Sequence, residues 1–101
     1  MAQITENTRN EVKEIVLDFF AEECEVDKSQ ITEESNIFED LDGDSLMFLE
    51  LIDIFKKKYN LNIELKTIGK YSAKHPVKTV GELIDMQMLI IQHEDKITEL
   101  N

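Results

Sequence analysis

Apolar residues recur at spacings of three and four positions in three segments of the chain, and this periodicity restricts the fold more than any other feature. In the first segment they stand at positions 12, 15, 16, 19 and 20, which lie on one face of an α-helix. Thr8 and Glu11 have capping-box spacing, so this helix should begin near residue 8. One proline and three glycines in 101 residues also favour helices over turn-rich β structure.

The second segment, from about Ser45 to Tyr59, carries two apolar stripes on different sides of one predicted helix. The stripe expected to face the core consists of Phe48, Leu51, Ile52, Phe55 and Tyr59. The other stripe is interspersed with charges, as on a face that docks a partner protein. Its members are Leu46, Met47, Glu50, Asp53, Ile54 and Lys57. The alternative is that another element of the same chain covers it.

A long polar connection, from about residue 22 to 44, joins these two helices. Connections of this length rarely lack structure, so we expect a short helical turn near Thr32 to Ser35. The side chains predicted to anchor the loop to the core are Ile37, Phe38 and Leu41. The loop would deliver Ser45 to one end of the helices.

The remaining segments predict a linker and two further helices. Residues 60–65 alternate apolar and polar without a partner strand, which predicts an extended linker anchored by Leu61, Ile63 and Leu65. Lysines at 66, 70 and 74 predict a short third helix with a basic edge, weakened by Gly69. Pro76 ends that helix, and Thr79 with Glu82 forms a second capping box. The expected core stripe of the last helix is Val80, Leu83, Ile84, Met88 and Ile91, widened by Met86, Leu89 and Ile90.

These elements predict an all-α four-helix bundle with a long loop between helices one and two and a short third helix. The length of 101 residues predicts a single domain, with a core over about 8–92 and an extended C-terminal helix or tail over 93–101.

Charge and targeting features limit the classes of partner. The net charge is −11, and residues 1–42 alone hold 13 acidic against 3 basic side chains. Such acidity disfavours binding to nucleic acid and anionic membranes and favours basic partner proteins. The alternative is that the charge only keeps the protein soluble. No apolar run is long enough to span a membrane, and the N-terminus lacks signal-peptide regions. With Cys24 as the single cysteine, we expect a cytoplasmic protein.

Residues 39–46, with the sequence EDLDGDSL, form a loop that ends at the second predicted helix. Gly43 permits a tight backbone, Asp44 is a strong N-cap, and Ser45 falls in the first turn with its hydroxyl predicted to face water. As a catalytic nucleophile Ser45 lacks a suitable context, because the two histidines, His75 and His93, lie far along the chain and no nucleophile-elbow motif is present.

Two other chemistries also fit poorly. Asp40, Asp42 and Asp44 match the first three calcium ligands of an EF-hand, but Ser45 and Leu51 replace the glycine and glutamate that should follow. We therefore expect no resident metal ion. The same acids would repel a free phosphate, and no P-loop lysine follows. A serine used as a covalent tether remains, with an attached phosphodiester at the positive end of the helix dipole.

From about residue 8 to 92 the chain resembles the acyl carrier protein family. The resemblance rests on Phe38-Glu39-Asp40-Leu41, Gly43-Asp44-Ser45-Leu46, Leu49-Glu50-Leu51 and Thr79-Val80, together with size and acidity. It implies a non-catalytic carrier with 4′-phosphopantetheine on Ser45, installed by a phosphopantetheinyl transferase that recognises Asp44, with Leu46 beside the attachment point. Acyl-loading, condensing and acyl-transferring enzymes of fatty acid, lipid or polyketide biosynthesis would then act on a monomeric carrier.

The family also implies a pocket for the acyl chain between the helices. The candidates to line it are Phe48, Leu51, Ile52, Phe55, Ile63, Leu83 and Ile84, although each also fits an ordinary core. Two alternatives stay open for the function: a peptidyl or aminoacyl carrier protein, and an unmodified helical adaptor protein.

Some residues depart from the family pattern. The run of lysines at 56–58 stands where the second helix is usually acidic, and Met47 stands where an acid is common. The connection from Ile63 to Val77 is long and basic. A basic enzyme surface suited to an acidic helix would meet lysines here, so we expect a specialised carrier with its own partners.

Overall fold

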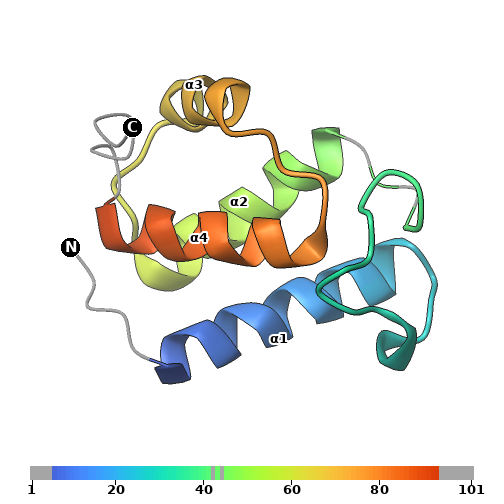
Figure 1. Cartoon of the computed structure of the whole chain (residues 1–101). Helices are drawn as coiled ribbons and strands as arrows, with labels where there is room; N and C mark the ends of the chain where they lie inside the picture. The colour runs from blue at the N-terminus through green and yellow to red at the C-terminus, as the bar shows by residue number, and fades with distance from the viewer. Residues whose placement is uncertain (1–5, 42, 44, 94–101) are drawn as a thin grey trace.

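The structure is a computed structural model that describes residues 6–41, 43 and 45–93. Its elements in chain order are α1 (Glu6–Glu23), the 3-10 helix η1 (Lys28–Gln30), α2 (Ser45–Tyr59), α3 (Leu65–Lys74) and α4 (Val80–His93) (Figure 1). The prediction of an all-α fold with a long loop after the first helix and a short third helix is confirmed. The predicted continuation of the last helix over 94–101 lies outside the described residues.

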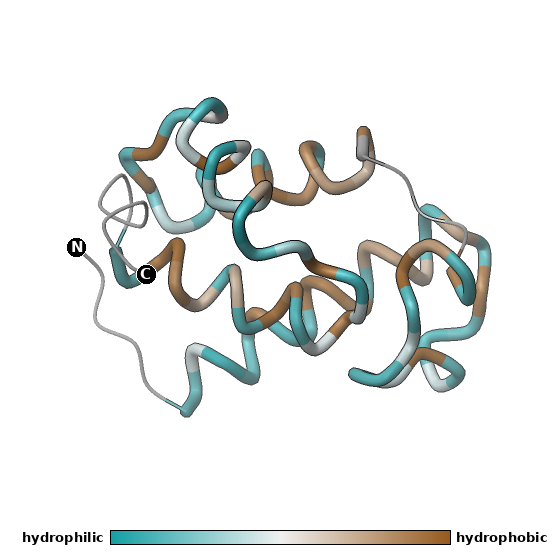
Figure 2. The backbone as a smooth tube through the Cα atoms, turned by 45° about the horizontal axis from the view of Figure 1, so that its top comes forward, coloured by the Kyte–Doolittle hydropathy of each residue, from teal (hydrophilic) through white to brown (hydrophobic). Residues whose placement is uncertain are grey.

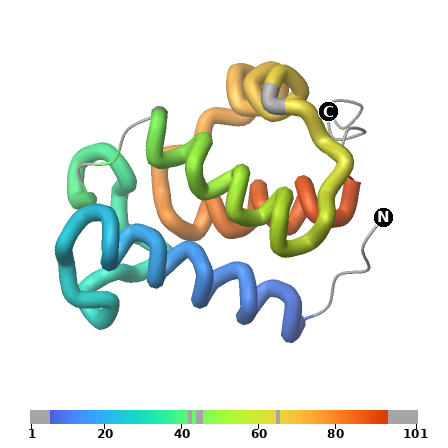
Figure 3. Tube along the Cα trace, turned by 180° about the vertical axis from the view of Figure 1, so that it is seen from behind, coloured from blue at the N-terminus to red at the C-terminus, as the bar shows by residue number. Residues whose placement is uncertain are grey.

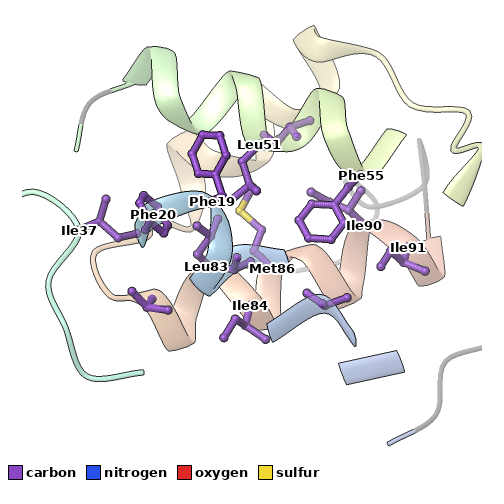
Figure 4. Close-up of a cluster of buried hydrophobic side chains, with 14 of the residues drawn as sticks. Phe19, Phe20, Ile37, Leu51, Phe55, Leu83, Ile84, Met86, Ile90 and Ile91 are labelled. Carbon is purple, nitrogen blue, oxygen red and sulfur yellow. The ribbon is translucent and has the colours of Figure 1, made fainter. Parts of the chain in front are cut away.

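The core lies between α1, α2 and α4, whose buried side chains meet in the centre of the molecule (Figure 4). α1 contributes Val12, Val16, Leu17, Phe19 and Phe20. α4 contributes Val80, Leu83, Ile84, Met86, Gln87, Ile90 and Ile91. Met88, expected in the central stripe, is only partly buried, because Met86 and Gln87 take the inward positions of that turn.

The long loop differs from its prediction in two places. The helical turn forms at Lys28–Gln30, where the Asp27 carboxylate accepts a hydrogen bond from the Ser29 amide at 3.0 Å, and not at residues 32–35. There the Ser35 amide donates to the Thr32 carbonyl at 3.1 Å, which closes a simple turn. Ile37 and Leu41 are buried as predicted, but Phe38 is 51% exposed.

Charged side chains connect the loop to the first and last helices. The Glu33 carboxylate accepts hydrogen bonds from Arg9 at 2.8 Å and lies 3.1 Å from the Lys13 amine, and Arg9 also reaches Asp85 of α4 at 3.3 Å. These cations, with the Arg9 hydrogen bond first, lower the pKa of Glu33 to about 2. The pairs are half-exposed, so they position the loop more than they stabilise the fold.

Several of the remaining predictions for the linker, α3 and α4 are confirmed. Leu65, predicted as a linker anchor, instead begins α3, and its side chain lies outside the described parts. Leu61 and Ile63 are buried in the linker, and no strand forms among the described residues. Lysines 66, 70 and 74 line the exposed side of α3. The capping box forms, with the Thr79 amide donating to Glu82 at 3.0 Å and the Glu82 amide donating to the Thr79 hydroxyl at 3.2 Å.

Candidate functional site at the start of α2

The loop before α2 is folded by the side chain of Asn36. Its amide oxygen accepts hydrogen bonds from the backbone N–H groups of Phe38 and Glu39, both at 2.9 Å. In return the Asp40 carboxylate accepts from the Asn36 N–H at 2.7 Å. Asparagine and aspartate are the residues that form such local turns, because their short side chains reach backbone amides two to four positions away. Residues 36–40 are therefore held in one compact turn.

The same loop is joined to the start of α4 by backbone hydrogen bonds. The Ile37 amide donates to the Lys78 carbonyl at 2.8 Å, and the amides of Val80 and Gly81 donate to the Ser35 and Glu33 carbonyls at 3.0 and 2.8 Å. Amides at a helix start have no partner within the helix, so the loop supplies the acceptors that α4 lacks. The loop and the beginning of α4 consequently form one unit at one end of the molecule (Figure 1).

Gly43 lies between this loop and α2 and packs closely against Ile37. Its amide donates to the Ile37 carbonyl at 2.7 Å. A Cβ atom built on Gly43 would lie 2.7 Å from Ile37 Cγ2 and 3.0 Å from Ile37 O, so glycine is needed for space. Its φ is not positive, and the tight backbone predicted at this position arises from this close approach.

The helix that follows begins at Ser45, as predicted. The predictions that Asp44 caps the helix and that the Ser45 hydroxyl faces water stay predictions, because Asp44 and the Ser45 side chain lie outside the described parts. A group attached at the first residue of a helix lies at the positive end of the helix dipole, which stabilises an anion. The lysines 56–58 occupy the last turn of α2, where positive charge is favourable for the same reason.

The outer face of α2 carries apolar side chains between charged ones, and no other element lies in front of it in Figure 3. Leu46 is 64% exposed and Ile54 is 40% exposed, whereas Met47 is half-buried and packs against the core. Leu49, which was not assigned to this face, is 42% exposed. Glu50, Asp53 and Lys57 are exposed, and Asp53 pairs with Lys57 at 3.0 Å. Figure 2 shows α2 changing from hydrophobic to hydrophilic along its length.

A pocket of about 490 Å³ lies beside the start of α2. Its lining residues come from the loop, the first turns of α2, the end of α3 and the connection to α4: Asn36, Phe38, Glu39, Phe48, Ser72, Pro76, Val77 and Lys78. Phe48 stands one helical turn after Ser45. The exposed Phe38 thus contributes to a pocket wall instead of the core.

Of the residues predicted to line an acyl pocket, Phe48 alone lines this pocket. The other six are at most 2% exposed and belong to the hydrophobic core: Leu51, Ile52, Phe55, Ile63, Leu83 and Ile84. Their role as an acyl pocket stays a prediction. Sequence reasoning missed Asn36, although asparagine in a loop is a turn-forming signal that could have found it. The pocket residues of the α3–α4 connection meet the loop only through tertiary contacts.

No three His, Cys, Asp or Glu side chains in residues 6–41, 43 and 45–93 are grouped so that they could hold a metal ion. None of the helices that these residues form has both the length and the apolar composition needed to cross a membrane.

Comparison with known proteins defines the class of this helical bundle, whose second α-helix begins at Ser45. The family model described as "Phosphopantetheine attachment site" matches residues 14–86. Proteins of this class bear a covalently attached 4′-phosphopantetheine group.

Individual relatives narrow the class. The chain is 45% identical over 100 residues to the "Acyl carrier protein homolog" of Clostridium acetobutylicum, with 99% of this chain and 97% of that protein aligned. It is 33% identical over 76 residues to the "Acyl carrier protein" of Porphyromonas gingivalis, covering 75% of this chain and 90% of that protein. It is 30% identical over 77 residues to the "Acyl carrier protein" of Thermotoga maritima, covering 76% and 88%. The chain therefore belongs to the acyl carrier protein family.

Proposed function

We propose that Ser45 carries the 4′-phosphopantetheine arm and that the protein transports acyl groups as thioesters on this arm. The observation that supports this most directly is the position of Ser45 as the first residue of α2, directly after a loop held to α4 by three backbone hydrogen bonds. A loop tied to α4 would present the serine to the transferase, while the long arm is free to swing. The protein then supplies position and recognition, and the chemistry belongs to the thiol of the arm and to the partner enzymes.

The pocket beside α2 supports the same proposal. Phe38, Phe48, Pro76 and Val77 supply apolar walls, and Asn36, Ser72 and Lys78 supply polar atoms. A phosphopantetheine arm alternates amide and methylene groups, so a pocket of mixed character one turn from Ser45 offers it a resting place. The arm would leave this pocket when a partner enzyme docks on the exposed face around Leu46, Leu49 and Ile54.

We further propose a non-catalytic, monomeric cytoplasmic carrier that forms one domain over residues 1–101. Asp44 would help a phosphopantetheinyl transferase recognise the site, and acyl-loading, condensing and acyl-transferring enzymes would act on the loaded arm. The pathway would be fatty acid, lipid or polyketide biosynthesis.

Ser45→Ala should abolish attachment of the arm completely. The purified protein is incubated with coenzyme A and a phosphopantetheinyl transferase, and its intact mass is measured. The wild type should gain the mass of one phosphopantetheinyl group, as should the control Ser29→Ala, which alters a serine of η1 in the loop. An unmodified wild type would indicate a helical adaptor, and modification of Ser45→Ala would place the arm elsewhere. The thioester found on protein from its native cell separates an acyl from an aminoacyl or peptidyl carrier.

The charge of α2 and α3 supports a specialised set of partners. Lys57, Lys58, Lys66, Lys70 and Lys74 are exposed, and between residues 56 and 78 Glu64 is the single acidic residue against seven lysines. Complementary surface charges raise association rates by about 10-fold to 1,000-fold, and a pair of like-charged surfaces forfeits this gain. A basic docking surface would therefore meet repulsion on this side of the carrier.

We expect a condensing enzyme of general fatty acid synthesis to use this carrier at least about tenfold less efficiently than an ordinary acyl carrier protein. The measurement is kcat/KM for both loaded carriers at the same low ionic strength. The variant Lys57→Glu/Lys70→Glu should recover part of the rate, because it reverses two exposed charges. Equal kcat/KM values for the loaded wild-type carrier and the loaded ordinary acyl carrier protein would refute a specialised partner set.

A further inference from the structure

The core contains a polar side chain that has no partner. Gln87 of α4 is 0% exposed, and among the described residues neither its amide nitrogen nor its carbonyl oxygen makes a hydrogen bond. The residues three and four positions away on the same helix are Leu83, Ile84, Ile90 and Ile91, all 0% exposed. Buried amides in native proteins almost always find a partner, because an unpaired one loses its bonds to water without replacement.

The surrounding helices do not supply that partner. Every buried side chain described on α1 and α2 is apolar, from Val12 and Phe20 to Leu51 and Phe55 (Figure 4). Within the described part of the chain, Gln87 is the one buried polar residue. The group that completes its hydrogen bonding must therefore come from outside this core.

The position of Gln87 indicates which group can reach it. α2 and α4 both begin at the end of the molecule that holds the loop (Figures 1 and 3). Gln87 lies seven residues into α4, about 10 Å along the helix axis from its first residue. A chain that enters the bundle from the Ser45 end and follows α4 inward would reach the level of Gln87 about two turns inside.

We infer that Gln87 is an internal binding residue for an acyl chain that carries a hydroxyl or keto group. The inference rests on the proposed function, because the chain arrives on the arm of Ser45. The Gln87 NH₂ group can donate to a keto or hydroxyl oxygen, and its carbonyl can accept from a hydroxyl. A saturated hydrocarbon would fill the same space and leave both groups unpaired. The carrier should therefore hold oxygenated chains inside the bundle in preference to saturated ones.

The test compares two phosphopantetheine arms that carry acyl chains of equal length through a linkage that resists hydrolysis. One arm ends in a saturated octanoyl chain and the other in a 3-hydroxyoctanoyl chain. Each is attached enzymatically, and intact mass confirms loading before the thermal midpoint Tm is measured. The hydroxylated chain should raise Tm by about 4 °C more than the saturated one, the shift that one additional hydrogen bond gives in a protein of this size. It should also move the NMR signals of the Gln87 side-chain amide.

Two variants give the inference its controls. Gln87→Leu should remove the difference between the two chains, while Ile91→Val, which perturbs the core one turn away, should retain it. Equal Tm shifts in the wild type, or a difference that persists in Gln87→Leu, would overturn the inference and indicate that an internal water or no group pairs with Gln87. Failure of the loading step itself would instead refute the proposed function, and intact mass reports it separately.

Discussion

Phe55→Ala is expected to lower the free energy of unfolding by about 3–5 kcal/mol, as measured by urea denaturation followed by circular dichroism. Phe55 is 0% exposed at the centre of α2 and stacks on Tyr59 with ring centroids 6.1 Å apart. Its removal deletes a large buried side chain and leaves a cavity that the neighbouring helices fill only in part. Because small proteins are stable by about 5–15 kcal/mol, this loss is a large part of the total.

The adjacent residue provides a matched control. Ile54 is 40% exposed on the outer face of α2, so Ile54→Ala should change the free energy of unfolding by about 0.5 kcal/mol. The proposed docking role of this face predicts that Ile54→Ala weakens partner binding while stability is kept. Equal destabilisation by the two substitutions would show that α2 is buried on both sides, and the partner face would then be wrong.

Gly43→Ala is expected to destabilise the protein by about 1–3 kcal/mol, because overpacking a filled site forces its neighbours apart. The new methyl group would approach Ile37 Cγ2 to 2.7 Å and the Ile37 carbonyl oxygen to 3.0 Å. Ile37 is buried and bonded to Lys78, so it has little room to yield. The displaced loop should also slow transfer of the arm to Ser45, which a time course of intact mass measures.

Gly69→Ala should raise the free energy of unfolding, the opposite of the effect expected for Gly43→Ala. Gly69 lies within α3, and no atom stands within 4 Å of the position its Cβ would take. Alanine is favoured over glycine in a helix by about 0.5–1 kcal/mol, so this variant should be more stable than the wild type. Arm transfer should proceed at the wild-type rate. Two glycine variants with equal effects would contradict the close packing of Gly43 on Ile37.

The positions of the helices followed from the sequence because they depend on local chemistry. The apolar spacing predicted α1 and α2, and the Thr79–Glu82 capping box predicted the start of α4, which the structure confirms. The candidate tether, Ser45, was likewise identified from the residues around it and from family resemblance. These features depend on residues within a few positions of each other along the chain.

Tertiary structure decided the features that depend on residues far apart in sequence. Phe38 looked like a core anchor, but the hydrogen bonds of Asn36 and Ile37 turn it outward to form a wall of the pocket. Glycine is needed at position 43 because Ile37 packs against it, and at position 81 because the Glu33 carbonyl approaches it closely. Gln87 was not singled out from the sequence, and only the packing of α1, α2 and α4 leaves its amide buried and, among the described residues, unpaired. Periodicity shows which face of a helix is apolar, whereas burial is decided by the elements that pack against that face.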